Sequence, residues 1–357
     1  MTASRRRDVQ PPLLDNQFTV ADLSAVGDDV WAVGLDRFPG PALIMHSAGG
    51  EPWQLTSYSS PGDPLFTQLS GVHATTSDDV WAVGSERVPY RTLILHGDGT
   101  TWQPVESPDS ADGQYLSAVA AWGRDDAFAV GSRQPATSPR SGLPSPAVKD
   151  TLAVRWDGAR WAAVPGPGRG ILTAVCAVGP GAYWAAGVTA HATRAGDVAL
   201  LAHYTDGQWQ QAGSEVAGAL FGVAAAGPDD VWAVGNDQDP SHPAGPLILH
   251  YDGQTWAPAS VPDVGGWSWL NAVASAGRDN VWAVGGRQRD DGSFGPFVMH
   301  FDGSAWAAVE PPGVSTGLVT GQLEAVIVLP GGEAWAAGQA TPGRAVTGFT
   351  LFETRDQ

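Results

Sequence analysis

The chain has 357 residues and a formal net charge of −18, with 16% charged residues. An excess of carboxylates opposes broad binding to nucleic acids or anionic membranes, because both require a basic surface. The 46 glycines and 28 prolines indicate many turns and oppose a mainly helical fold. A single cysteine, Cys176, excludes an intramolecular disulfide, and we expect its thiol to be buried and inert.

The N-terminus begins like the charged part of a signal peptide but does not continue as one. Three arginines, at 5–7, are followed by Asp8-Val-Gln-Pro-Pro12, which supplies neither an apolar core nor a cleavage site. No apolar run is long enough to span a bilayer. We therefore expect a cytoplasmic monomer that binds neither nucleic acid nor membrane, needs no cofactor and holds no metal.

Copies of the sequence Asp-Val-Trp-Ala-Val-Gly recur along nearly the whole chain, roughly 50 residues apart. Each unit has a leading apolar segment, this motif, a second apolar segment, an Asp-Gly type turn and a second tryptophan. The leading segments start at Leu23, Leu69, Leu116, Leu172, Leu220, Leu270 and Leu323. The motif aromatics are Trp31, Trp81, Phe128, Trp184, Trp232, Trp282 and Trp335. The second tryptophans are Trp53, Trp102, Trp161, Trp209, Trp256 and Trp306.

Each unit contains four short runs of β-branched and aromatic residues between turns, which predicts four antiparallel strands. A sheet with two apolar faces must stack against its neighbours around an axis. The sequence therefore predicts an all-β fold, a seven-bladed β-propeller of four-stranded antiparallel blades in one domain, 1–357. The predicted parts are an N-terminal arm, 1–17, and blades at 18–64, 65–110, 111–166, 167–213, 214–262, 263–315 and 316–357.

The ends of the chain predict how the ring closes. The seventh unit stops before its tryptophan strand, and Asp8-Val-Gln-Pro-Pro12 resembles Ala308-Val-Glu-Pro-Pro312, which ends the sixth unit. We expect the N-terminal segment to supply the outer strand of the last blade, because closure leaves no exposed sheet edge.

Repeated acids and histidines have the composition of a metal or catalytic site. The acidic pairs, such as Asp229-Asp230, lie in the first turn of most units, where turn geometry explains them. The histidines occupy one position of the third strand, at His46, His96, His203, His250 and His300. Repetition places such residues far apart around a ring, so we interpret both sets as framework residues.

Candidate binding residues come from irregular loops and from the starts of the inner strands. One set is arginine, which would bind an anion or carboxylate unless it forms local ion pairs: Arg37, Arg87, Arg133, Arg287 and Arg289. A second set is aromatic and would stack on a sugar, an aromatic ligand or a peptide side chain, with packing at the channel mouth as the alternative: Phe66, Tyr115, Phe221, Trp267 and Trp269. The third set is polar: Asp22, Gln68, Gln322 and Glu324.

Within the polar set, Asp22 and Glu324 are the candidates for binding a cation or for acid and base catalysis at the channel mouth. The Pro/Ser-rich insertion at 133–150 is interpreted as a flap over the variable face or a disordered loop. No phosphate-binding Gly-rich loop, zinc-ligand spacing or Gly-x-Ser-x-Gly motif is present.

The motif Asp-Val-Trp-Ala-Val-Gly at 230–235, followed by His-Tyr-Asp-Gly-x-x-Trp at 250–256, resembles a family of bacterial repeat proteins. The resemblance covers residues 18–353 and implies a seven-bladed β-propeller, related loosely to sialidase-type and WD-type repeats, in a family mostly without assigned activity. The Asp-Gly-x-x-Trp turn also resembles the sialidase Asp-box. In that motif one residue separates the Asp from the Gly, so no sialidase active-site residue is carried over.

Two functions from different classes fit these features. The leading hypothesis is a binding scaffold that recognises a peptide, a protein or a small polar ligand on the variable loop face. The alternative is a cytoplasmic propeller enzyme, a lyase, cyclase or hydrolase, that acts on a small metabolite or peptide at the central channel mouth. A lectin is a third possibility, opposed by the lack of a repeated aromatic–acid pair on the loop face.

Overall fold

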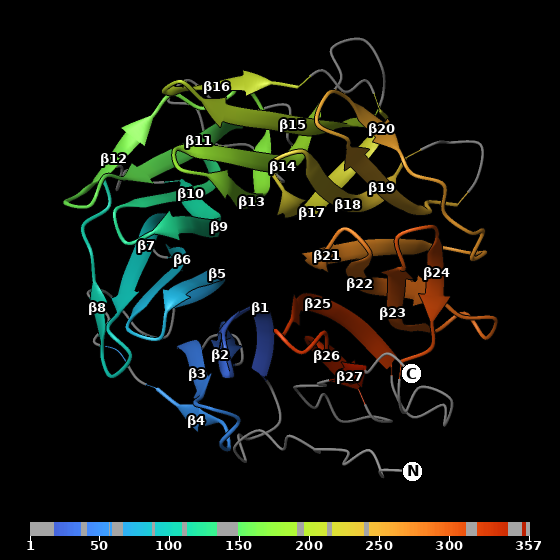
Figure 1. Cartoon of the computed structure of the whole chain (residues 1–357), viewed down its shortest axis with the longest axis horizontal. Helices are drawn as coiled ribbons and strands as arrows, with labels where there is room; N and C mark the ends of the chain where they lie inside the picture. The colour runs from blue at the N-terminus through green and yellow to red at the C-terminus, as the bar shows by residue number, and fades with distance from the viewer. Residues whose placement is uncertain are drawn as a thin grey trace.

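The computed structural model describes residues 18–36, 41–56, 58, 67–87, 90–108, 113–133, 149–190, 196–212, 216–238, 243–311, 320–341 and 352–354. Within these residues, six four-stranded sheets and one three-stranded sheet surround a central axis (Figure 1). All strand pairs are antiparallel, and in each sheet the strands follow chain order from the axis outwards. The architecture is that of a β-propeller.

The strands fall into four concentric sets. The innermost are β1 (Phe18–Val26), β5 (Thr67–Thr76), β9 (Gln114–Gly123), β13 (Ile171–Gly179), β17 (Gly218–Gly227), β21 (Ser268–Gly277) and β25 (Thr320–Val328). The second are β2 (Asp29–Asp36), β6 (Asp79–Arg87), β10 (Asp126–Arg133), β14 (Ala182–Ala190), β18 (Asp230–Asp237), β22 (Asn280–Gln288) and β26 (Ala334–Thr341). The third are β3 (Ala42–Ser47), β7 (Tyr90–Gly97), β11 (Asp150–Trp156), β15 (Asp197–Thr205), β19 (Pro246–Tyr251), β23 (Phe294–Phe301) and β27 (Phe352–Thr354). The outermost are β4 (Gln54–Leu55), β8 (Trp102–Pro104), β12 (Trp161–Val164), β16 (Gln208–Gln211), β20 (Trp256–Pro258) and β24 (Trp306–Val309).

The prediction of an all-β propeller of four-stranded antiparallel blades is confirmed, but the described residues contain six complete blades, not seven. The sheet β25–β27 stands where the seventh blade was expected and has three strands. Its inner strand contacts β21 on one side and β1 on the other, so the ring is continuous. The predicted closing segment, 8–12, lies outside the described residues.

In the first repeat, the stretch from the leading residue to the motif glycine is one residue shorter than in the other repeats, and this difference corrects the alignment. Val20 pairs with Gly34, whereas Leu69 pairs with the equivalent Gly84. The strand β5 has two irregularities in its pairing and β1 has one. Val20, not Leu23, is therefore the equivalent of the leading leucines, and Leu23 occupies the position of Val72.

Tryptophans connect each sheet to the next around the ring. The motif tryptophan of one blade packs against the inner strand of the following blade, as Trp232 does in one buried cluster with Leu270 and Val273. It also meets that blade's outer tryptophan edge to face, with Trp232 and Trp306 centroids 5.4 Å apart at 78°. The pairs Trp184–Trp256 and Trp81–Trp161 repeat this arrangement. Aromatic burial and edge-to-face contact together stabilise the ring.

The repeated histidines stack on the motif tryptophans of their own blades. The His250 ring lies 3.9 Å from the ring of Trp232, and its Nε2 is 2.8 Å from Oδ1 of Asp230. His96 and Asp79 make the same contact at 2.7 Å, and His300 bonds Asn280 at 3.1 Å. The second acid of the turn motif thus fixes the histidine as well as the turn, which supports a framework role for both.

The last glycine of each motif lies against an irregularity in the inner strand. In β17 the pairing with β18 shifts between Leu220 and Gly222, so Phe221 bulges out of register. A Cβ on Gly235, opposite the bulge, would lie 1.9 Å from the carbonyl oxygen of Ala219. Glycine is therefore required there, because any larger residue would displace the bulge.

Removing a motif tryptophan should destabilise the whole ring. Trp232 is 3% exposed, so Trp232→Ala should lower the free energy of unfolding by about 3–5 kcal/mol through cavity formation. The control, Trp122→Ala, changes a tryptophan that is 53% exposed and should have an effect below about 0.5 kcal/mol. Urea unfolding followed by circular dichroism measures both, and equal effects would contradict the packing role.

Candidate functional site

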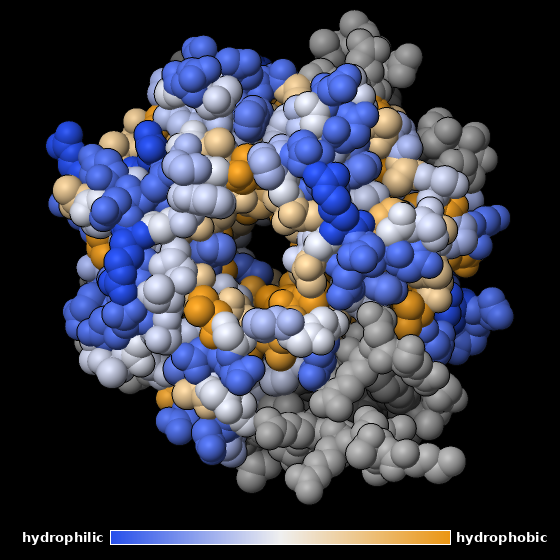
Figure 2. All heavy atoms as spheres, viewed as in Figure 1, coloured by the Kyte–Doolittle hydropathy of each residue, from blue (hydrophilic) through white to orange (hydrophobic). Residues whose placement is uncertain are grey.

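The inner strands surround a cavity of about 330 Å³ in the central channel. Figure 2 shows the channel open on the face in view. The bulged residue of every inner strand lines the cavity, because a bulge re-aims one side chain out of the plane of pairing. These residues are Ala21, Ser70, Ser117, Thr173, Phe221, Asn271 and Glu324. The fold therefore presents one variable side chain per sheet to a common space.

Two of these side chains use their hydrogen-bond donors within the framework. The Thr173 hydroxyl lies 2.8 Å from the carbonyl oxygen of Leu220, in the next sheet. The Asn271 side-chain amide donates to the carbonyl oxygen of Leu323, at 2.8 Å, again in the next sheet. These bonds link neighbouring blades, and the second N–H and the carbonyl oxygen of the Asn271 amide are left for other partners.

Asp22 links the first two sheets and faces the cavity. Its Oδ1 accepts a hydrogen bond from the backbone N–H of Leu23, and its Oδ2 accepts one from Val72 in β5, both at 2.9 Å. The equivalent position in the other sheets holds glycine or alanine, as at Gly71 and Gly222. Burial raises the pKa of Asp22 to about 7, although the two backbone N–H groups act in the opposite direction.

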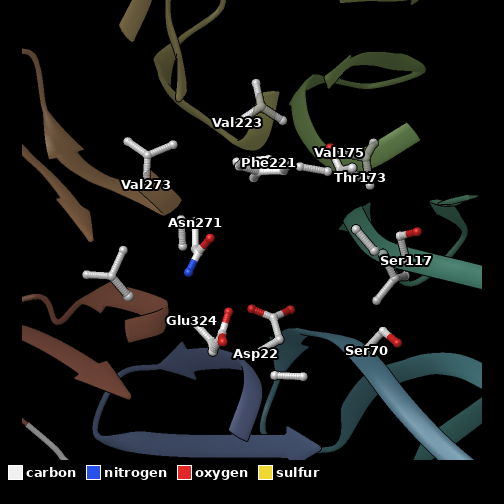
Figure 3. A pocket seen from close by; sticks show the side chains of 17 residues that line it. Asp22, Ser70, Ser117, Thr173, Val175, Phe221, Val223, Asn271, Val273 and Glu324 are labelled. Atoms are coloured by element: carbon white, nitrogen blue, oxygen red, sulfur yellow. The ribbon is translucent and has the colours of Figure 1, made fainter. Parts of the chain in front are cut away.

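Glu324 contributes a second carboxyl group from β25. Its Oε1 accepts a hydrogen bond of 2.5 Å from the Gln322 side-chain amide. Burial raises the pKa of Glu324, and the bond from Gln322 lowers it in part. Figure 3 shows the carboxyl groups of Glu324 and Asp22 on one wall of the cavity.

The opposite wall is apolar. Phe221 lies across the cavity from Asp22 and Glu324, with Val223 and Val175 near it (Figure 3). The cavity therefore has a carboxyl wall and an aromatic wall, an arrangement that would hold a ligand with a polar end and an apolar end.

Several predicted loop residues make local contacts instead of meeting at one site. Arg287 forms an ion pair with Glu310 at 3.5 Å, and its guanidinium lies 5.8 Å from the ring centroid of Phe297. The Arg289 guanidinium lies against Gly295. Trp269 packs on Phe294, with ring centroids 5.5 Å apart, and Trp267 is 53% exposed beside them.

Other predicted residues lie away from the cavity or outside the described residues. Tyr115 accepts a hydrogen bond of 2.6 Å from Lys149, and Arg133 is exposed at the end of β10. Gln68 precedes the leading leucine of β5 and does not line the cavity. The structure does not describe Phe66, Arg37, the Arg87 side chain or the insertion at 134–148.

Sequence reasoning missed four cavity residues: Ser70, Ser117, Thr173 and Asn271. The repeat alignment contains the signal that would have found them, because each directly follows a leading leucine. Phe221 and Glu324 were selected for their residue types, although they occupy this same position.

Three further properties of the described residues concern metal binding, the single thiol and membrane spans. No group of three or more His, Cys, Asp or Glu residues there is arranged to hold a metal ion. Burial raises the pKa of Cys176 to about 12, so this thiol stays protonated and unreactive at neutral pH. Among the described residues, no helix has the length and apolar character needed to cross a membrane.

Comparison with known proteins gives the fold and no family. No protein-family model matches the chain, and no curated protein sequence matches it. Among solved structures, it is similar to YCF48 bound to D1 peptide, with 16% identity over 96% of this chain and 94% of that chain and a TM-score of 0.59. The chain has a β-propeller fold. Membership of the bacterial repeat family stays a prediction.

Two further structures show the same likeness. YCF48 from Cyanidioschyzon merolae is 15% identical over 97% of each chain, with a TM-score of 0.58. A GH74 xyloglucanase from Xanthomonas campestris is 16% identical over 97% of this chain and 53% of that chain, with a TM-score of 0.60. At such low identity these likenesses establish the fold alone.

The raised pKa of Asp22 predicts a pH-dependent contribution to stability. The folded state holds this proton to a higher pH than the unfolded chain does. The contribution is therefore present below the unfolded pKa of 3.8 and is lost as the pH rises through about 7. Between about pH 4 and pH 7, the free energy of unfolding of the wild type should fall by up to about 4 kcal/mol relative to that of Asp22→Asn. Urea unfolding across this pH range measures the difference, and a constant difference would contradict it.

Proposed function

We propose that this protein is a binding scaffold that holds a small ligand, or one side chain of a peptide, in its central channel. The observation that carries this proposal is the convergence of seven bulged residues, one from each inner strand, on a cavity of about 330 Å³. Their side chains range from alanine and serine to phenylalanine and glutamate, while the framework around them repeats. Such variation at a fixed position is typical of a recognition site on a rigid scaffold.

A channel site is supported over a site on the variable loop face. Among the predicted loop residues, Arg287 already has a carboxylate partner and Trp269 packs on Phe294. By contrast, Ser117 and Glu324 face the cavity together with Phe221. The YCF48 structure with a bound peptide is consistent with a propeller of this shape acting as a binding module.

An enzyme acting at the same cavity is the second candidate. It is favoured by Asp22 and Glu324, two neighbouring carboxyl groups whose pKa values are both raised by burial. Such a pair would supply a general acid and a general base. The binding scaffold is favoured over the enzyme because Asp22 accepts two hydrogen bonds from backbone N–H groups, and these give its carboxyl group a structural role in linking two sheets.

Filling the cavity should abolish binding without disturbing the fold. Ser117→Phe places at the bulge of β9 the residue that β17 carries at the equivalent Phe221, so the framework already accommodates it. Ligand-observed NMR of a small-molecule library first identifies compounds that bind the wild type. These compounds should bind the variant at least about tenfold more weakly. Trp267→Ala, which changes the loop face, should leave the same affinities unchanged. Loss of affinity for these compounds in Trp267→Ala, with unchanged affinity in Ser117→Phe, would contradict the proposal.

We also propose that β25–β27 is the seventh blade and that the segment 8–12 supplies its outer strand. The support is the sequence similarity of 8–12 to 308–312, which begins in the last two residues of β24 of the neighbouring blade, and the contact of β25 with β1. Deleting residues 1–17 should then lower the melting temperature by several degrees, since an unpaired sheet edge would be left. An unchanged melting temperature would contradict this closure.

A further inference from the structure

The two carboxyl groups make one wall of the cavity mainly an acceptor surface, and the donors that remain in the lining are the hydroxyls of Ser70 and Ser117 and the second N–H of the Asn271 amide. The Asn271 amide donates one hydrogen bond to the carbonyl oxygen of Leu323, and the Thr173 hydroxyl contacts the carbonyl oxygen of Leu220. On the same surface, Glu324 accepts one hydrogen bond, from Gln322, although a carboxylate has about four acceptor positions. A ligand that satisfies this wall must therefore bring donors.

The two carboxyl groups have no cationic partner in the cavity. Every residue that lines it is neutral except Asp22 and Glu324; no lysine, arginine or histidine is present among the described lining residues. A buried carboxylate without a counter-charge is costly, and this cost is what raises the pKa of both groups. A bound cation would stabilise both ionised groups in place of a proton.

We propose that the channel ligand carries an ammonium or guanidinium group on an apolar stem, with the cation between Glu324 and Asp22 and the stem against Phe221. This inference rests on the proposed function and narrows it to a class of ligand. Figure 3 shows the aromatic ring across the cavity from the two carboxyl groups, which gives the stem an apolar wall. A free amine and a lysine or arginine side chain of a peptide share this chemistry.

Affinity for such a cation should rise with pH. The titratable groups facing the cation are Asp22 on β1 and Glu324 on β25; the lining residues of β5, β9, β13, β17 and β21 include no titratable side chain. Below pH 7 the Asp22 carboxyl group is mostly protonated and neutral. The cation must then displace a proton, and so it binds more weakly.

The experiment compares three unbranched probes of five carbon atoms each and of different charge: n-pentylamine, 1-pentanol and pentanoate. Calorimetric titration into the full-length protein at about pH 8 should show binding of n-pentylamine at least about tenfold tighter than that of the other two. Binding should weaken several-fold at about pH 5.5. In a second arm, acetyl-Gly-Gly-Lys-amide is compared with the norleucine peptide that lacks the ammonium group, which distinguishes a peptide side chain from a free amine.

A matched pair of variants locates the cation. Glu324→Gln keeps an oxygen for the hydrogen bond from Gln322 but loses the charge, and should weaken n-pentylamine binding about tenfold. Glu51→Gln removes an equal charge from an exposed position before β4 and should have no effect. Circular dichroism confirms that both variants are folded.

The outcomes separate this inference from the function on which it rests. Equal or tighter binding of 1-pentanol or pentanoate, or an n-pentylamine affinity unchanged in Glu324→Gln, would overturn the cation inference and leave a channel-binding scaffold standing. If no probe binds, the cation inference fails and the channel scaffold is decided by the library screen. If the library hits still bind Ser117→Phe with unchanged affinity, the channel is not the binding site and both proposals fail.

Discussion

The close approach between the motif glycine of each second strand and the bulge of the inner strand is the constraint on which the rest of the structure depends. At Gly84, Gly235 and Gly285, an added Cβ would lie 1.9–2.1 Å from a backbone carbonyl oxygen of the inner strand. This space admits only glycine. The bulge in turn directs one side chain per sheet into the channel. A residue repeated for the sake of the fold therefore determines where the variable residues lie.

In the proposed function, packing between blades and ligand recognition belong to different residues of the same repeat. The tryptophans, such as Trp232 and Trp306, lie between sheets and hold neighbouring blades at fixed positions. The bulged residues lie outside these apolar clusters, so they can change without disturbing the tryptophan packing, although Thr173 and Asn271 also hydrogen-bond the next sheet. Phe221 and Glu324 occupy equivalent positions and differ in size, charge and polarity. This separation explains how a highly repetitive chain can contain a site without symmetry.

The sequence predicted the framework well because the framework repeats. The strands, the roles of the tryptophans and the hydrogen-bonded histidines all follow from the pattern around residues 230–256. The first repeat was misaligned, because Val20 replaces the leading leucine and the stretch from Val20 to Gly34 is one residue shorter than its equivalents in the other repeats. Arg287 looked like an anion-binding residue, but its partner Glu310 is distant in sequence, so its ion pair was not visible. A bulge leaves no signature within a single repeat and shows only when the repeats are aligned on the leading leucine, which is why Asn271 and Ser117 were missed.

The central claim is that the asymmetric charge of the channel selects a cation with an apolar stem. The most direct measurement is a crystal structure of the protein grown at about pH 8 with n-pentylamine. The account predicts electron density for the amine in the cavity, with its nitrogen within hydrogen-bonding distance of Glu324 and its carbon chain against Phe221. Density for the amine beside Trp267 on the loop face, with none in the channel, would contradict it.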